Sequence, residues 1–160
     1  MQNINIRKAT KEDIETLIKL RIDYLTEDKM ISPSGTEQQA IEILREYFVK
    51  HIDSGDFIAE LAEVEKKIAA VAFLVIYERP INPSYMTSGK TAVIYNVLTY
   101  REYRRQGIAT KLLERLIEEA KKANVSFIEL SASSMGKSVY EKLGFKEKQK
   151  SNHTEMKLNL

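Results

Sequence analysis

The segment from Val93 to Lys122 constrains the fold more than any other part of this chain. It opens with an apolar run, Val93–Thr99, that is typical of a buried strand. A basic turn with one glycine follows over residues 100–107. The apolar residues then recur at helical spacing, at Ile108, Leu112, Leu113, Leu116, Ile117 and Ala120. The segment therefore predicts a strand, a basic turn and the start of an amphipathic helix.

This arrangement suits the binding of a phosphate group. The first turn of a helix has backbone N–H groups without partners inside the helix, and the helix dipole makes that end positive. Gly107 lets the backbone approach a ligand closely, and Arg104 and Arg105 add forked donors. The segment lacks the Gly-Lys-Ser/Thr of a P-loop and the three glycines of the dinucleotide fingerprint. An ordinary strand-to-helix turn with a solvated basic cluster is the alternative interpretation.

The remaining elements are predicted from the same patterns. A strand at Ile4–Arg7 leads through a capping sequence, Thr10–Asp13, into a helix, and a second helix ends near His51. The later elements are strands at Phe57–Glu63, Ile68–Tyr77, Thr91–Thr99 and Phe127–Leu130, a helix through Val139 to Leu143 closed by Gly144, and two final strands at Phe145–Lys148 and Glu155–Leu158. The predicted order is βααβββαβαββ, in a single domain over residues 1–160.

Composition excludes several classes of protein. The chain has 43% apolar and 30% charged residues and a net charge of +2, which is too small to indicate a nucleic-acid or membrane surface over the whole molecule. It has no cysteine, and its two histidines lie far apart without metal-ligand spacing, so a metal site has little support. No apolar run approaches the ~20 residues of a membrane span and no signal peptide is visible, so a cytoplasmic protein is the default expectation.

Two motifs resemble those of a known family. Arg104-x-x-Gly107-x-Ala109 after an apolar strand resembles motif A of the GNAT superfamily of acyl-CoA-dependent N-acetyltransferases, and Val139–Phe145 resembles the Tyr-Glu-Lys-Leu-Gly-Phe segment of motif B. The element order is also that of the family, so the resemblance covers essentially the whole chain. It implies an α/β (α+β) fold, with a mixed, mostly antiparallel central sheet and helices on both faces. One departure is Ser133, where many members carry Asn.

The resemblance implies acetyl-CoA as co-substrate. The pyrophosphate would lie on the backbone amides that follow Arg104, and the pantetheine arm would run along the strand that ends at Thr99. A backbone N–H of this strand would polarise the thioester carbonyl. The implied cofactor-binding residues are Val97, Leu98, Thr99, Arg104, Arg105, Gln106, Gly107, Ile108, Ala109, Thr110 and Ser133.

Tyr140 is the catalytic residue that the resemblance implies, as the acid that protonates or hydrogen-bonds the leaving thiolate. A phenol pKa near ~10 and a thiol pKa near ~8.5 make that proton transfer nearly balanced. The alternative is that Tyr140 only packs its ring beneath the sheet. The general base stays open among Tyr95, Asn96, Glu102 and a chain of water molecules.

The expected reaction is direct acetyl transfer to a primary amine of a small molecule or protein, because the chain has no cysteine for an acyl-enzyme. The alternative is a non-catalytic acyl-CoA-binding sensor. The loops Thr26–Gly35 and Glu78–Lys90 are expected to recognise the amine, with Asp23 and Glu27 as candidates to attract a cation. Neither a nucleic-acid nor a membrane partner is expected. Homodimers are common in the family, but nothing in the sequence locates an interface.

Overall fold

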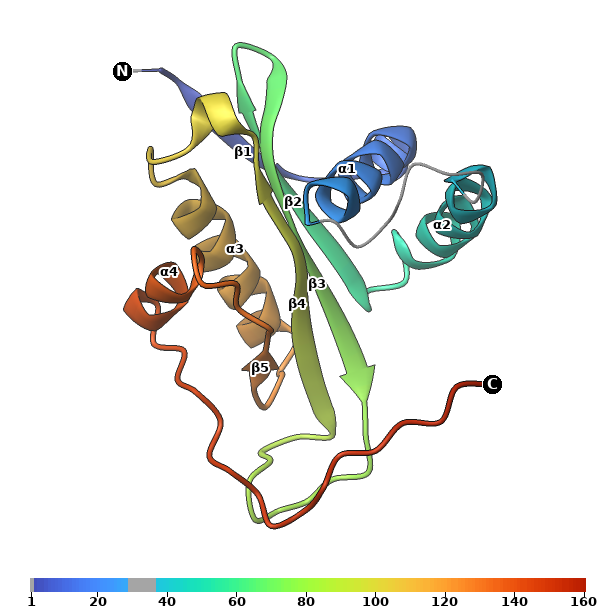
Figure 1. The fold of residues 1–160 in the computed structure, drawn as a ribbon, viewed down its shortest axis with the longest axis vertical. Helices are drawn as coiled ribbons and strands as arrows, with labels where there is room; N and C mark the ends of the chain where they lie inside the picture. Colours follow the sequence, from blue (N-terminus) through green and yellow to red (C-terminus); the bar gives the residue numbers. More distant parts are fainter. Residues whose placement is uncertain (1, 29–36) are drawn as a thin grey trace.

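The centre of the molecule is a five-stranded sheet in the order β1-β2-β3-β4-β5 (Figure 1). This computed structural model describes residues 2–28 and 37–160. The first four strands pair antiparallel and β5 pairs parallel to β4. The elements are β1 (Ile4–Lys8), α1 (Ile14–Glu27), α2 (Glu37–His51), β2 (Phe57–Val64), β3 (Lys67–Glu78), β4 (Lys90–Thr99), α3 (Ile108–Lys122), β5 (Ile128–Glu129) and α4 (Lys137–Lys142), with short 3-10 turns at Lys11–Asp13 and Arg101–Tyr103.

Helices cover both faces of the sheet and create two hydrophobic cores. Helices α1 and α2 lie on one face, and α3 and α4 on the other (Figure 1). Successive strand residues point to opposite faces, so Leu61 and Val71 enter the first core while Ala62 and Ala72 enter the second. These features confirm the predicted fold class. Among the described residues, no helix is both long and apolar enough to cross a membrane.

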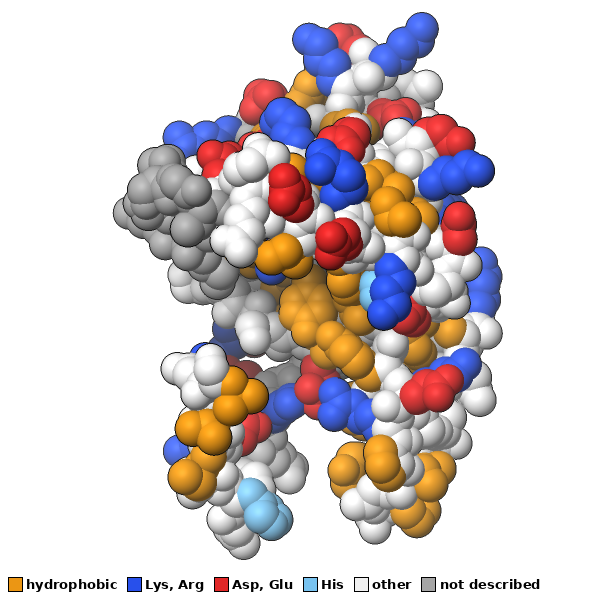
Figure 2. Space-filling model, turned by 90° about the vertical axis from the view of Figure 1, so that its right-hand side faces the viewer, with side chains coloured by type: hydrophobic (Ala, Val, Ile, Leu, Met, Phe, Trp, Pro, Cys, Tyr) orange, Lys and Arg blue, Asp and Glu red, His pale blue; other side chains and the backbone are white. Residues whose placement is uncertain are grey.

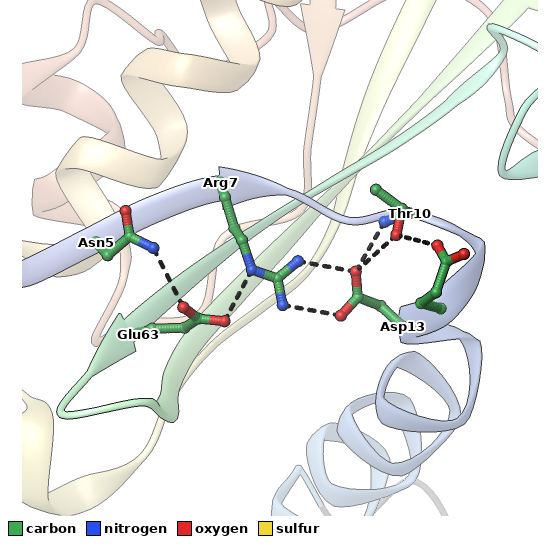
Figure 3. A network of polar contacts seen from close by, with 6 residues as sticks. Asn5, Arg7, Thr10, Asp13 and Glu63 are labelled. Atoms are coloured by element: carbon green, nitrogen blue, oxygen red, sulfur yellow. Dashed lines mark hydrogen bonds and ion pairs between the residues drawn. The ribbon is translucent and has the colours of Figure 1, made fainter.

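The junction between β1 and α1 is fixed by a polar network centred on Arg7 (Figure 3). The Arg7 guanidinium donates to both carboxylate oxygens of Asp13, at 2.8 and 2.9 Å, and to Glu63 of β2 at 2.8 Å. The Asp13 carboxylate also accepts from the backbone N–H of Thr10 at 2.8 Å, which confirms the predicted cap. Hydrogen bonding from Arg7 lowers the pKa of Asp13, so this carboxylate is ionised at neutral pH. The network sets the direction in which α1 crosses the sheet.

Strand β4 carries a bulge in its pairing with β3. Its pairing with β3 shifts between Val71 opposite Leu98 and Phe73 opposite Tyr95, which leaves Asn96 and Val97 opposite the single residue Ala72. Asn96 has a φ of 56°, in the left-handed region that Asn tolerates better than most residues. On its other side, β4 pairs with β5 only at Ala92 and Val93. Within the described chain, β5 therefore does not flank the second half of β4.

The prediction of two closing strands is wrong for the described structure. Neither Phe145–Lys148 nor Glu155–Leu158 is a strand, and β5 is limited to Ile128–Glu129. Phe145 still packs against the α3–α4 core, but every residue from Lys146 to Leu160 is exposed, and the tail extends as coil to the C-terminus (Figure 1). Figure 2 shows hydrophobic side chains on projections that stand off from the body of the molecule. The physical reason is that a strand needs a partner for its backbone groups, and this tail has none among the described residues.

Candidate active site

The turn between β4 and α3 presents a row of backbone amides. Arg105 and Gly107 both have left-handed backbones, with φ values of 65° and 74°, and such turns form anion-binding concavities. In the described part of the chain, none of the backbone N–H groups of residues 105–110 donates to a backbone carbonyl. The next N–H along the chain, that of Lys111, donates to the carbonyl of Gly107 at 3.2 Å. A Cβ built on Gly107 would meet no atom within 4 Å, so the space in front of the turn is open. Residues 105–110 therefore form one continuous turn into α3 whose amides have no backbone acceptor in the described structure.

The side chain of Arg104 is engaged within the protein. Its Nε donates to the carbonyl of Thr99 at 2.9 Å, and its guanidinium forms an ion pair with Glu27 of α1. Arg105 is exposed, whereas the Ile108 side chain lies in the α3–α4 core. Residues 105–107 are all exposed, so this turn lies at the surface of the molecule. Contacts from these residues to a cofactor stay predictions.

The end of β4 offers its backbone rather than its side chains. The Leu98 side chain belongs to the α1–α2 core, and Val97 packs against the α3–α4 core. The bulge at Asn96 and Val97 interrupts regular pairing with β3, and bulges re-aim groups next to functional sites. This geometry is compatible with the expectation that a backbone N–H near Val97 or Leu98 contacts the thioester.

Tyr140 lies half-buried on α4, against the α3–α4 core. Its ring packs edge-to-face on Phe145, with centroids 6.0 Å apart. Burial raises the pKa of Tyr140, and the neighbouring Tyr24 of α1 raises it further. No hydrogen-bond partner for its hydroxyl occurs among residues 2–28 and 37–160. The phenol therefore stays protonated at neutral pH, with its O–H available to a ligand.

Ser133 precedes α4 and supports its first turn. Its Oγ accepts from the backbone N–H of Gly136 at 3.2 Å, and its carbonyl accepts from Lys137 at 3.0 Å. Ser133 is exposed, and its own hydroxyl proton is not used in these two contacts. A local structural role is therefore visible, while its contact with a cofactor stays a prediction.

A group of tyrosine hydroxyls lies near the bulge of β4. The hydroxyls of Tyr77 and Tyr95 are 3.2 Å apart, and this hydrogen bond with burial raises the pKa of Tyr77 to about 12. Asn96 is only 2% exposed and accepts a hydrogen bond from Arg21 of α1 at 3.2 Å. Glu102 is exposed in the 3-10 turn. These positions identify no general base, which stays open.

The carboxylates expected to attract a cation are engaged elsewhere. Asp23 accepts from Lys19 and from the Tyr100 hydroxyl, both at 2.5 Å, and Glu27 pairs with Arg104. Of the two loops expected to recognise the amine, residues 29–35 of the first lie outside the described residues. Sequence reasoning missed Arg21, although a charged residue on the otherwise apolar stripe of α1 is a visible signal.

The fold and this site define the class of acyltransferases that use coenzyme A thioesters. Residues 15–145 match the model of the "Acetyltransferase (GNAT) family", and the chain belongs to that family. A predicted acetyltransferase from Clostridium acetobutylicum, solved with acetyl-CoA, is 32% identical with a TM-score of 0.80, covering 98% of this chain and 96% of the other.

Two more distant structures share the fold. A GCN5-related N-acetyltransferase from Ralstonia eutropha is 22% identical, with a TM-score of 0.78 and coverage of 99% of each chain. Glucosamine-6-phosphate N-acetyltransferase from Arabidopsis thaliana is 20% identical, with a TM-score of 0.70, covering 98% of this chain and all of the other. Identities this low show the fold alone, so they do not transfer a substrate.

Proposed function

We propose that the protein transfers an acetyl group from acetyl-CoA directly to a primary amine of a small molecule or peptide. The observation that carries this proposal is the row of amides without backbone acceptors at the start of α3, together with the part of β4 that β5 does not flank. Membership of the GNAT family and the relative solved with acetyl-CoA support it.

The residues present fit acetyl-CoA, which supplies the thioester that carries the acetyl group. Amides of residues 105–110 would hold the pyrophosphate, since a helix N-terminus and a left-handed turn both attract anions. The absence of a Cβ at Gly107 leaves the approach to these amides open. The edge of β4 near Val97 and Leu98, which β5 does not flank, would pair with the amides of the pantetheine arm.

In the reaction, the amine nitrogen bonds to the acetyl carbon and the carbon–sulfur bond breaks. A backbone N–H from the bulged end of β4 would stabilise the developing oxyanion, a contact worth ~3 kcal/mol in well-studied oxyanion holes. The Tyr140 hydroxyl gives its proton to, or hydrogen-bonds, the departing thiolate. The proton of the amine passes to the general base, which is not assigned to a residue, or to water.

The test is amine-dependent release of free CoA thiol from the full chain with acetyl-CoA and a panel of amines, together with mass detection of the acetylated product. We expect thiol release and product to appear together. CoA binding by calorimetry without thiol release for any amine would favour the alternative, a non-catalytic acyl-CoA-binding sensor.

A further inference from the structure

Arg21 interrupts the apolar stripe of α1. Ile14, Leu17, Ile18 and Leu25 follow helical spacing on one face, and Leu17 and Ile18 are buried. Arg21 occupies the position seven residues after Ile14, where this pattern calls for an apolar side chain. A cation at an inward position is costly unless its charge is used.

The structure holds Arg21 against the bulge of β4. Its Nη1 donates to Oδ1 of the buried Asn96 at 3.2 Å, and its guanidinium lies 5.7 Å from the ring centroid of Tyr24. Burial lowers the pKa of Arg21, while neighbouring Tyr24 and Tyr95 act in the opposite direction.

No carboxylate of the protein neutralises Arg21. Among residues 2–28 and 37–160, no Asp or Glu lies within ion-pair distance of it. Residues 1 and 29–36 contain no Asp or Glu, so they cannot supply one from a side chain. The nearest acids of α1, Asp23 and Glu27, pair with Lys19 and Arg104 instead. The site thus has a half-buried positive charge that pairs with no carboxylate of the described structure.

We infer that the acceptor amine carries an oxyanion group, a carboxylate or a phosphate, which binds Arg21. The guanidinium fork matches such groups with two parallel hydrogen bonds, and Asn96 holds the fork in place. Asn96 directly precedes Val97, where the thioester is proposed to lie. One small molecule can therefore place its oxyanion on Arg21 and its amine at the thioester. This inference rests on the proposed function.

The experiment compares matched acceptors that differ only in the anion. The pairs are β-alanine with β-alaninamide, and 2-aminoethyl phosphate with ethanolamine. In the wild-type protein, kcat/KM should favour one or both anionic members by about tenfold to a hundredfold, the range for a hydrogen-bonded charge. Arg21→Met should remove this preference, mainly through KM, and Arg21→Lys should retain part of it. The pair that shows the larger preference indicates whether Arg21 binds a carboxylate or a phosphate.

Lys19→Met is the matched control, since it removes a cation two residues earlier on α1 that already pairs with Asp23. It should keep the preference for the anion. Equal kcat/KM within both pairs, or a preference that survives Arg21→Met, would overturn the inference. A thermal-shift arm with CoA-saturated protein separates this inference from the proposed function: β-alanine or 2-aminoethyl phosphate should raise Tm in wild type but not in Arg21→Met, even if no amine is acetylated. No shift with either compound would also overturn it.

Discussion

A β-carbon on Gly136 would lie 3.1 Å from Cε2 of Tyr140 and 3.3 Å from Oγ of Ser133. The ring of Tyr140 therefore rests directly over the glycine that begins α4. Gly136 has an ordinary backbone, with a φ of −87°, so glycine is needed for the close approach of the ring and not for backbone conformation. The ring of the proposed acid thus lies in close contact with Gly136, the residue that caps the N-terminus of α4.

Gly136→Ala should move the Tyr140 ring by a few tenths of an ångström. If the hydroxyl acts on the leaving thiolate, kcat should fall by about tenfold, because even small displacements of a reacting group are costly. Acetyl-CoA affinity and Tm should change little. Ser138→Ala, an exposed position on the same helix, is the control for kinetics and melting. A wild-type kcat for Gly136→Ala would contradict the idea that this ring position matters.

Tyr140→Phe removes the hydroxyl and keeps the ring. We expect turnover to fall by ~10²-fold or more, the usual range for losing a general acid, with little change in acetyl-CoA affinity. Because burial raises the pKa of Tyr140, any loss of wild-type activity from its ionisation should occur above the ordinary phenol value of ~10, and the Phe variant should lack it. Steady-state kinetics against pH measure both effects.

The packing interpretation of Tyr140 makes the opposite prediction. Turnover of Tyr140→Phe would then match wild type, and Tyr140→Ala would lower stability by about 3 kcal/mol through the cavity it leaves. Melting curves recorded beside the kinetics separate the two roles.

Gly107→Val should weaken CoA binding at least tenfold, measured by calorimetry. The new side chain would occupy the open space before the amides of α3 and would strain a backbone with a φ of 74°. Gly55→Val is the matched control, because Gly55 has a φ of 84° and equally open surroundings but lies between α2 and β2. Both variants should lose about 1 kcal/mol of stability, and CoA affinity should fall only for Gly107→Val. Equal CoA affinity in both would remove the pyrophosphate from this turn.

Glu60→Gln should stabilise the protein at neutral pH. The Glu60 side chain is 0% exposed in β2, its carboxylate oxygens have no hydrogen-bond partner in the described structure, and Arg115 lies 3.6 Å away. Burial raises the pKa of Glu60, so its protonated form fits the folded state better. The contribution of the Glu60 carboxyl group to the free energy of unfolding is fully present below the unfolded-state pKa of ~4.3. It is lost as pH rises through the folded-state pKa.

Urea unfolding at pH 4.5 and pH 8 measures this effect. The gain from Glu60→Gln should be about 1 kcal/mol at pH 8 and smaller at pH 4.5. Glu63→Gln is the control, because the Glu63 carboxylate accepts hydrogen bonds from Arg7 and Asn5, and losing it should destabilise the protein. A destabilising Glu60→Gln at pH 8 would show that Arg115 more than offsets the burial of the charge.

The sequence by itself determined the features that depend on neighbouring residues. Helical spacing after Ile108, the glycine at position 107 and the cap from Thr10 to Asp13 all reappear in the structure. These features rest on local periodicity, backbone freedom and short-range hydrogen bonds, which are encoded within a few residues. The glycine at position 107 and the helix that follows it lie within residues 15–145, which match the family model.

Tertiary structure alone decided which charges and strands find partners. Arg104 pairs with Glu27 and Arg21 with Asn96, across 77 and 75 residues of sequence, and no local pattern specifies such contacts. The prediction of two closing strands failed for the same reason. Alternation of apolar and polar residues predicts a strand, but it cannot supply the neighbouring strand that satisfies the backbone hydrogen bonds. The bulge at Asn96 likewise exists only through its register against β3. Long-range partners therefore follow from the fold, because residues far apart in sequence meet only once the sheet and helices are packed.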